Sequence, residues 1–237
     1  MQYVTDDGAV PGLRERKKRA TRAALAEAAV RLAAEHGAEN VTVEAISEAA
    51  GVSPRTFFNY FDSHDDAFVM IDRDAGERVR RAVREAPAGL SPLDAVREAL
   101  ATELVDVAER QEIWTLRAKV LQRSPQLLVR GLGAHMAEEI EMAETIAVRI
   151  GSRAPRKEPP AAAGSCENGP GAPGPDLYSR LLAAVAGTAA RVAIEHWCAQ
   201  GPGADFPEVL RSVFAHLAAG LPEPPPATGL PEPSPTG

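Results

Sequence analysis

Hydrophobic residues recur at helical spacing along most of the chain, and strict alternation of apolar and polar residues is nearly absent. The first apolar stripe consists of Leu25, Ala28, Ala29 and Leu32, which share one face of a helix predicted over residues 14–36. Gly37 follows this helix as a stop signal. A hydrophobic period close to that of an α-helix along the whole chain predicts an all-α fold.

Start signals divide the rest of the chain into eight further helices. Ser, Thr or Asp precedes most of the remaining apolar stripes, and proline often follows at the first helical position. Ser63 and Asp66 have the spacing of a capping box. The predicted helices cover residues 43–50, 54–61, 64–86, 92–110, 112–123, 125–150, 176–200 and 205–217.

Three segments lack a pattern that could form a core. Residues 1–12 are short and polar, residues 151–175 are rich in Gly, Pro and Ala, and residues 221–237 are rich in Pro. We predict that all three are disordered, with residues 151–175 acting as an internal linker.

The segment TVEAISEAAGVSPRTFFNYFDSH, at residues 42–64, has the pattern of a helix-turn-helix. Gly51 lies in the turn, where a positive φ is needed. The spacing predicts that Ala45, Ile46, Ala49, Val52, Phe57 and Phe61 form a small core. That arrangement leaves Arg55, Thr56, Phe58, Asn59 and Tyr60 facing outward from the second helix.

The outward residues suit the reading of DNA. Arg55 can donate two hydrogen bonds to guanine, and Asn59 can pair with adenine. Phe58 can touch a thymine methyl group or a sugar edge. The hydroxyls of Thr56 and Tyr60 suit phosphate oxygens, which fix the register without reading sequence.

A basic cluster precedes the helix-turn-helix and is opposed only by Glu15. It consists of Arg14, Arg16, Lys17, Lys18, Arg19 and Arg22. A solvated helix start is the alternative interpretation. The helix macrodipole disfavours cations near an N-terminus, however, so phosphate binding explains the cluster better.

Residues 14–68 closely resemble the TetR family of bacterial transcriptional regulators, on the helix-turn-helix, the helix before it and the FFNYF ending. The resemblance implies a nine-helix fold with a DNA-binding domain over residues 13–62. It also implies a ligand-binding and dimerisation domain over residues 63–220. The homodimer would form mainly through the last two predicted helices, packed as a four-helix bundle.

The resemblance also assigns roles by position. Arg55, Phe58 and Asn59 would face bases, whereas Thr42, Thr56 and Tyr60 would hold phosphates, and Ser53 belongs to the same DNA-binding set. Family members usually carry lysine where this chain has His64. His64 can still donate a neutral hydrogen bond, but it lacks a permanent charge near pH 7.

The block WTLRAKVLQRSPQ, at residues 114–126, is similar to the effector domain of an actinobacterial subgroup of the family. Some members of that subgroup respond to acyl-CoA-type ligands. The candidate pocket residues are Trp114, Arg117, Leu121, Met136, Ile140 and Trp197. Core packing is the alternative for the Trp and Met residues, and an ion pair with Glu is the alternative for Arg117.

Charge and composition exclude several other classes. The chain has 26 Lys+Arg and 33 Asp+Glu, a net charge of -7, which argues against coating DNA or anionic membranes through bulk charge. The positive charge is instead gathered at residues 14–22 and at Arg55. The N-terminus has no apolar core like that of a secretory signal. The most apolar stretch, residues 181–197, is interrupted by charges and is shorter than a membrane span, so we predict a cytoplasmic protein.

The sequence offers no sign of a cofactor, a metal site or catalysis. Cys166 and Cys198 cannot build a disulfide framework, and the five histidines lack metal-ligand spacing. We therefore predict a ligand-responsive regulator that binds a palindromic operator as a homodimeric repressor and is released by a small, hydrophobic or acyl-CoA-like effector. An all-helical enzyme or a protein-binding adaptor, each retaining a helix-turn-helix, is the alternative.

Overall fold

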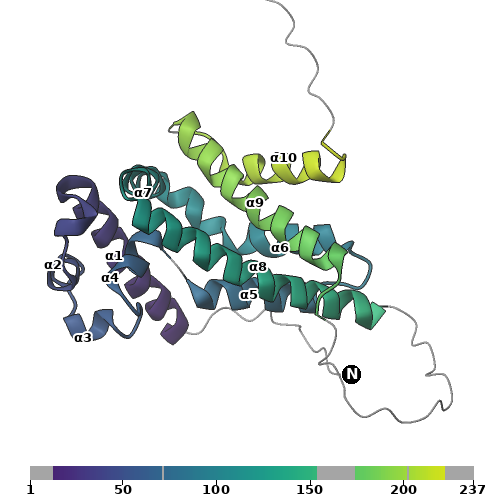
Figure 1. Ribbon diagram of the computed structural model, residues 1–237, viewed down its shortest axis with the longest axis horizontal. Helices are drawn as coiled ribbons and strands as arrows, with labels where there is room; N and C mark the ends of the chain where they lie inside the picture. The colour runs from purple at the N-terminus through teal and green to yellow at the C-terminus, as the bar shows by residue number, and fades with distance from the viewer. Residues whose placement is uncertain (1–12, 71, 154–173, 202, 222–237) are drawn as a thin grey trace, which may run out of the picture.

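The computed structural model describes residues 13–70, 72–153, 174–201 and 203–221, and all regular structure in these ranges is helical (Figure 1). The predicted all-α fold is therefore confirmed for this part of the chain. The α-helices are α1 (Leu13–His36), α2 (Val43–Ala49), α3 (Pro54–Phe57), α4 (His64–Val69), α5 (Arg73–Glu85), α6 (Pro92–Glu103), α7 (Gln111–Arg123), α8 (Pro125–Arg153), α9 (Leu177–Gln200) and α10 (Phe206–Ala218). Two short 3-10 helices, Ala38–Asn40 and Val105–Arg110, join them.

Most helices begin at the residues that the sequence marks as caps. The side chains of Thr42, Ser53, Ser91 and Asp176 each accept a hydrogen bond from a backbone N–H in the first turn, at 2.7–3.2 Å. Ser63 and Asp66 form the expected capping box. These contacts satisfy N–H groups that have no partner within their helix, which fixes where each helix starts.

The described part of the chain contains ten α-helices, whereas the sequence predicts nine, because the predicted helix over residues 64–86 is interrupted. Met70 adopts a left-handed conformation, with φ 54° and ψ 37°, and ends α4. Asp72 then caps α5 by accepting a hydrogen bond from the N–H of Asp74 at 3.1 Å. A left-handed residue breaks the helical hydrogen-bond pattern at that point. The apolar stripe crosses this break, so the sequence does not reveal it.

Three other boundaries differ from the prediction. Helix α3 ends at Phe57 and continues as turns over residues 58–60. The predicted helix over residues 92–110 is α6 followed by a 3-10 helix. Helix α8 continues to Arg153, so residues 151–153 of the predicted linker are helical. The rest of that linker up to residue 173, the N-terminus over residues 1–12 and the tail over residues 222–237 lie outside the described residues.

Two hydrophobic cores lie at the two ends of the molecule. The first joins α1–α4 around Leu25, Ile46 and Phe57, and it also receives Val120 from α7 and Leu127 from α8. The second joins α5–α10, with Val83, Val96, Ile146, Trp197 and Phe214 among its members. In Figure 1, α1–α4 form one end of the molecule, and α7 and α8 lie against them. The two cores are therefore connected through α7 and α8.

Helix α9 is the most apolar helix of the described chain. Its 24 residues are long and apolar enough to cross a membrane, whereas the stretch 181–197 singled out in the sequence is too short. The core helix of a soluble protein can have the same length and hydropathy. Only 33% of its most apolar window is buried. A large part of an apolar helix is therefore left on the surface of the single chain.

Arg149 of α8 is a buried cation that closes the end of α5. Its guanidinium donates hydrogen bonds to the carbonyls of Val83, Ala86, Pro87 and Leu90, at 2.7–3.3 Å. Carbonyls at the end of a helix have no partner within the helix, so a side chain that satisfies several of them holds the helix and its following loop in place.

Replacing Arg149 by Met should lower the free energy of unfolding by about 2–4 kcal/mol, because several carbonyls would lose their donors. The measurement is urea denaturation followed by circular dichroism. Arg211→Met is the matched control, since Arg211 is exposed and pairs with Glu208 on its own helix. Equal effects of the two substitutions would contradict this role of Arg149.

Candidate nucleic-acid interface

The helix-turn-helix is formed by α2, a tight turn and α3. Gly51 has φ 68°, the left-handed conformation that the turn requires. The N–H of Val52 then donates to the Ser47 carbonyl at 2.9 Å, which brings the chain back toward α3. Ile46 and Phe57 are fully buried between the helices. Ala49, predicted as a core residue, is exposed at the last position of α2, and the next residue, Ala50, packs against the core instead.

The outward-facing surface agrees in part with the prediction. Arg55, Phe58 and Asn59 are exposed, and Thr56 and Tyr60 are half-buried. Phe58 is 59% exposed although the ring of the preceding Phe57 is buried against it edge-on. Because α3 ends at Phe57, Phe58 and Asn59 lie on the turn after the helix rather than on its face. This turn presents an aromatic ring and an amide directly to solvent.

The basic cluster on α1 divides into two groups. Arg14, Arg16 and Lys17 are exposed and form no ion pair with another described residue. A surface hollow lined by Arg14, Lys17, Asn59 and Tyr60 brings this group beside the turn after α3. This surface thus brings cations of α1, which suit phosphates, beside Asn59 and Tyr60 of the turn after α3.

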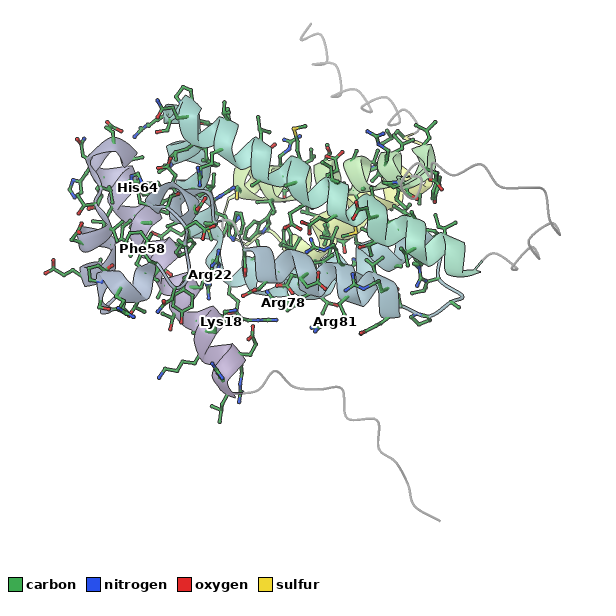
Figure 2. The ribbon with its side chains drawn as sticks, turned by 60° about the horizontal axis from the view of Figure 1, so that its bottom comes forward. Lys18, Arg22, Phe58, His64, Arg78 and Arg81 are labelled. Carbon is green, nitrogen blue, oxygen red and sulfur yellow. The ribbon has the colours of Figure 1, made fainter. Side chains whose placement is uncertain are left out.

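The other three cations of the cluster are paired within the chain. Lys18 bonds to Asp74, Arg19 lies 3.8 Å from Glu15, and Arg22 lies 3.5 Å from Asp72. Figure 2 shows Lys18 and Arg22 between the label of Phe58 and α5. The charges of these three cations are therefore balanced by carboxylates of the same chain.

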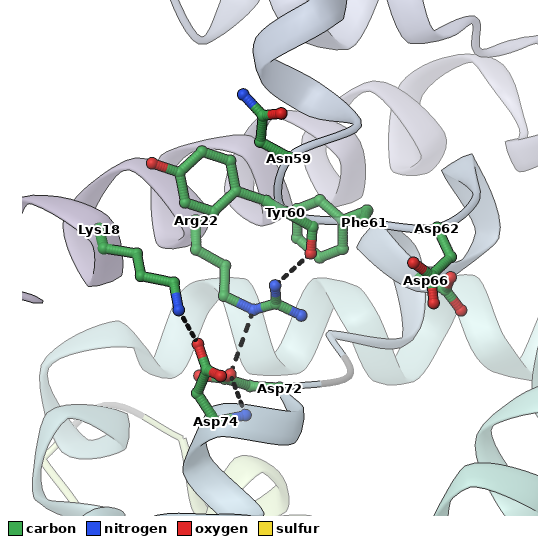
Figure 3. A pocket seen from close by; sticks show the side chains of 9 residues that line it. All are labelled: Lys18, Arg22, Asn59, Tyr60, Phe61, Asp62, Asp66, Asp72 and Asp74. Atoms are coloured by element: carbon green, nitrogen blue, oxygen red, sulfur yellow. Dashed lines mark hydrogen bonds and ion pairs between the residues drawn. The ribbon is translucent and has the colours of Figure 1, made fainter.

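Arg22 connects three segments of the fold. Its guanidinium donates a hydrogen bond to the Tyr60 carbonyl and lies 4.3 Å from the centre of the Phe61 ring. Burial lowers the pKa of Arg22, against the opposing effect of Asp72 and Asp74. Together with the Asp72 pair, these contacts tie α1 to the turn after α3 and to the start of α5 (Figure 3). The structure places Arg22 in this link rather than on the outer face.

Asp72 and Asp74 are functional candidates that the sequence analysis missed. The hydrogen bond between Lys18 and Asp74 raises the pKa of Lys18 and lowers that of Asp74. Both carboxylates, with Lys18 and Arg22, line a hollow of about 190 Å³ between α1 and α5 (Figure 3). Lys18 and Asp74 are 56 positions apart in sequence, so no local pattern signals the contact.

His64 and Thr42 make local contacts. His64 lies in the first turn of α4, with its Nδ1 3.0 Å from the Asp65 carboxylate and its ring edge-on to Phe68. The Thr42 hydroxyl is exposed and serves as the α2 cap, and Ser53 shares a 2.9 Å hydrogen bond with Thr56. Each of these three predicted DNA-binding residues therefore also has a role in fixing the local backbone or side-chain conformation.

Helix α4 is held at both ends by guanidinium groups from α7 and α8. At its N-terminal end, Arg130 of α8 donates to the buried Asp66 carboxylate from Nε and Nη2, at 2.8 and 2.7 Å. At its C-terminal end, Arg117 of α7 donates to the Val69 carbonyl from Nε and Nη2, at 3.2 and 3.0 Å. Burial lowers the pKa of Arg117 to about 10, so it remains charged near neutral pH.

The six predicted pocket residues do not surround one cavity in the described chain. Trp197 is buried in the second core, with its indole N–H donating to the Ala204 carbonyl at 2.9 Å, and Leu121 packs on the first core. Trp114 is half-buried, with the Arg117 guanidinium 5.1 Å from its ring centre. Met136 and Ile140 lie on the outer surface of α8, 63% and 61% exposed. Met136 and Ile140 are four positions apart and share one face of α8, and helical spacing alone does not show whether that face is covered.

Metal-binding groups do not cluster in the described part of the chain. No set of three or more His, Cys, Asp or Glu residues there could hold an ion. Cys198 is half-buried, and burial raises its pKa, whereas Cys166 lies outside the described residues.

The two groups of cations should respond differently to substitution. Arg22→Met should lower the free energy of unfolding by about 1–3 kcal/mol, because the Tyr60 carbonyl and Asp72 lose a charged partner. Arg16→Met should change it by less than about 0.5 kcal/mol, since Arg16 is exposed. Chemical denaturation of the two variants side by side measures the difference, and a stability loss for Arg16→Met as large as that for Arg22→Met would contradict the division.

Comparisons with known proteins agree with this geometry. A family profile described as "Bacterial regulatory proteins, tetR family" matches residues 25–69, which include the whole helix-turn-helix. A second profile, the MftR C-terminal domain, matches residues 170–222. The chain therefore resembles the TetR family over these two segments. The predicted resemblance is thereby confirmed for these residues.

One curated relative is the HTH-type transcriptional regulator TcmR of Streptomyces glaucescens. It is 34% identical over 147 residues, covering 60% of this chain and 65% of TcmR, so the match spans slightly less than two thirds of that protein.

Solved structures support the TetR-like fold. SmeT in complex with triclosan has a TM-score of 0.53 at 14% identity, covering 88% of this chain and all of SmeT. A TetR-family regulator from Syntrophomonas wolfei has a TM-score of 0.51 at 17% identity, covering 86% of this chain and 97% of that one. At such identities the likeness shows the fold alone.

Proposed function

We propose that this TetR-like chain is a ligand-responsive transcriptional repressor that binds a palindromic operator as a homodimer and leaves it when a small-molecule effector binds. The observation that carries the proposal is the shared face of α1 and the turn after α3. There, exposed cations lie beside an exposed arginine, aromatic ring and amide on a capped helix-turn-helix. An enzyme or a protein-binding adaptor would not need that combination.

The two kinds of side chain on this face divide the work of recognition. Arg55 and Asn59 present planar donor and acceptor groups, which suit the base edges of the major groove. Arg14, Arg16 and Lys17 supply charge for phosphates, which gives affinity without sequence preference. Thr42, Ser53, Thr56, Tyr60 and His64 supply neutral hydrogen-bonding groups at the margin of the same surface.

The route from effector to operator passes through α4. Arg117 and Arg130 come from α7 and α8, in the domain that we propose binds the effector over residues 63–220. A movement of α7 or α8 would carry α4, and with it the helix-turn-helix domain over residues 13–62. An operator bound by a dimer requires the two recognition helices about 34 Å apart. An effector that favours another spacing therefore weakens operator binding by population shift.

We propose a hydrophobic or acyl-CoA-like effector from the resemblance of residues 114–126. Trp114 and Arg117 support it, because they are the two predicted pocket residues that contact each other and they join an aromatic surface to a buried positive charge. We also propose that the protein acts in the cytoplasm, where its operator lies.

The operator can be obtained by selecting duplexes from a random library with the wild-type chain. Arg55→Ala should then weaken binding by about 1–3 kcal/mol, concentrated at one base position. Arg16→Ala should weaken all sequences alike and reduce the slope of affinity against salt by about one unit. Fluorescence anisotropy at several salt concentrations measures both effects.

Arg97→Ala provides the control for these substitutions, since Arg97 lies on α6 and pairs with acids of its own helix. Selection of no duplex by the wild-type chain would overturn the regulator and favour the enzyme or adaptor. An unchanged affinity of Arg55→Ala would overturn only the assignment of the base-reading residue.

Removing the guanidinium that holds Asp66 should loosen α4. Arg130→Leu should speed backbone hydrogen exchange over residues 64–69 and weaken operator binding, although Arg130 lies outside the proposed DNA-contacting surface. Arg97→Leu should change neither property. Exchange in α4 that stays at the wild-type rate in Arg130→Leu would show that the Asp66 contact does not hold the helix.

A further inference from the structure

Lys18 lies at the border between two surface hollows of the described chain. On one side it lines the hollow between α1 and α5, where its ammonium group pairs with the Asp74 carboxylate (Figure 3). On the other side it lines the hollow of the proposed DNA-binding face, together with Arg14 and Lys17. Asn59 lines both hollows, so the two are adjacent. The flexible four-carbon stem of a lysine allows its charge to move from one hollow to the other.

We propose that Asp74 is an autoinhibitory residue, whose carboxylate occupies Lys18 in the free chain and releases it to a DNA phosphate when a duplex binds. The inference rests on the proposed DNA-binding function and adds a regulation to it. In the sequence, Lys18 is one of six clustered cations that suit phosphate. The pair makes its contribution to binding conditional on Asp74.

The pair between Lys18 and Asp74 is exposed enough to exchange partners. The two side chains are 46% and 49% exposed, and ion pairs in such positions stabilise a protein little because water screens them. The hydrogen bond raises the pKa of Lys18 and lowers that of Asp74, so both groups are charged at neutral pH. A phosphate gains additional free energy from the release of counterions held by DNA. It can therefore compete with the carboxylate for Lys18.

The neighbouring Arg22 is held by more contacts than Lys18. Its side chain and that of Asp72 are only 17% and 27% exposed, and Arg22 also contacts the Tyr60 carbonyl and the Phe61 ring. Asp72 in turn caps α5 and lies 3.6 Å from Arg78. These contacts keep α1 and α5 together while Lys18 changes its partner.

Asp74 does not become an isolated charge when Lys18 leaves. Its carboxylate is half exposed to water, and the positive charges of Arg22 and Arg78 still act on it. It also lies in the first turn of α5, where the helix macrodipole stabilises a carboxylate. The release of Lys18 therefore costs little free energy.

The exchange links DNA binding to the position of α5. Lys18 belongs to α1, and Asp74 follows the left-handed break at Met70 by four positions. A shift that draws α5 away from α1 frees Lys18 and raises the affinity for DNA, whereas a shift that brings them closer lowers it. By linkage, bound DNA weakens the contact between Lys18 and Asp74 by the same factor.

Fluorescence anisotropy with a duplex of random sequence, at several salt concentrations, tests the proposal. Asp74→Asn should raise the affinity about two- to fivefold, because Lys18 no longer has to leave a carboxylate. Lys18→Met should lower the affinity and reduce the slope of log affinity against log salt by about one unit. Asp74→Asn combined with Lys18→Met should bind as Lys18→Met alone does.

Glu112→Gln is the matched control. It removes the same charge from another exposed ion pair of α1, in which Arg31 lies 2.8 Å from Glu112. Arg31 lines neither of the two hollows. The affinity of Glu112→Gln should therefore stay close to that of the wild-type chain, because salt screens distant exposed charges.

Nuclear magnetic resonance can follow the exchange of partners directly. With carbon-13 in the aspartate carboxyl groups, the signal that Asp74→Asn removes belongs to Asp74. Adding the duplex to the wild-type chain should move this signal toward its position in free Lys18→Met. A signal that does not move would show that Lys18 stays on Asp74 and would overturn the proposal.

The binding measurements contradict the proposal in two ways. A gain from Asp74→Asn that persists with Lys18→Met would come from net charge and not from the contact. No gain from Asp74→Asn would show that the pair only ties α1 to α5. In both cases duplex binding by the wild-type chain would leave the proposed function standing. A wild-type chain that binds no duplex even at low salt would overturn the proposed function as well.

Discussion

The short helix α4 depends on two guanidinium groups that come from helices α7 and α8. Asp66 is buried and negatively charged, so it requires donors, and Arg130 together with the capping box provides them. The Val69 carbonyl ends the helix beside a left-handed residue, and Arg117 provides its donors. Removing one partner of a buried charged contact typically costs about 3–5 kcal/mol. A helix of six residues held in this way moves with α7 and α8 rather than independently of them.

The ion pairs between α1 and α5 add a second constraint at the same junction. Arg22 and Lys18 meet Asp72 and Asp74 just after the left-handed break at Met70. The carboxylates neutralise the inner half of the basic cluster and leave Arg14, Arg16 and Lys17 on the outer half. A chain with net charge -7 therefore confines its attraction for phosphate to a small surface. On such a small surface, phosphate contacts alone give weak binding to any duplex. Contacts to bases at a specific site then add a larger share of the affinity.

Contacts within one turn of helix are predictable from sequence, and contacts between helices are not. Thr42, Ser53, Ser91 and Asp176 act as predicted, because each accepts a hydrogen bond from a residue only three positions on. The outward positions of Arg55, Phe58 and Asn59 also follow from spacing alone. The inner role of Arg22 does not, since its carboxylate partner Asp72 belongs to another helix. The exposure of Met136 and Ile140 does not follow from spacing for a related reason: periodicity identifies an apolar face without showing what covers it.

Helix α8 relates these constraints to one another. Leu132, Met136 and Ile140 leave an apolar surface on this helix exposed in the single chain. In this fold the same helix, α8, presents that surface and supports α4 through Arg130. A movement of α8 would therefore reach α4 directly through the contact between Arg130 and Asp66. A repressor that responds to its effector by changing the spacing of two recognition helices requires a rigid connection of this kind. If α4 could move independently of α8, the recognition helices could keep their spacing when the effector binds.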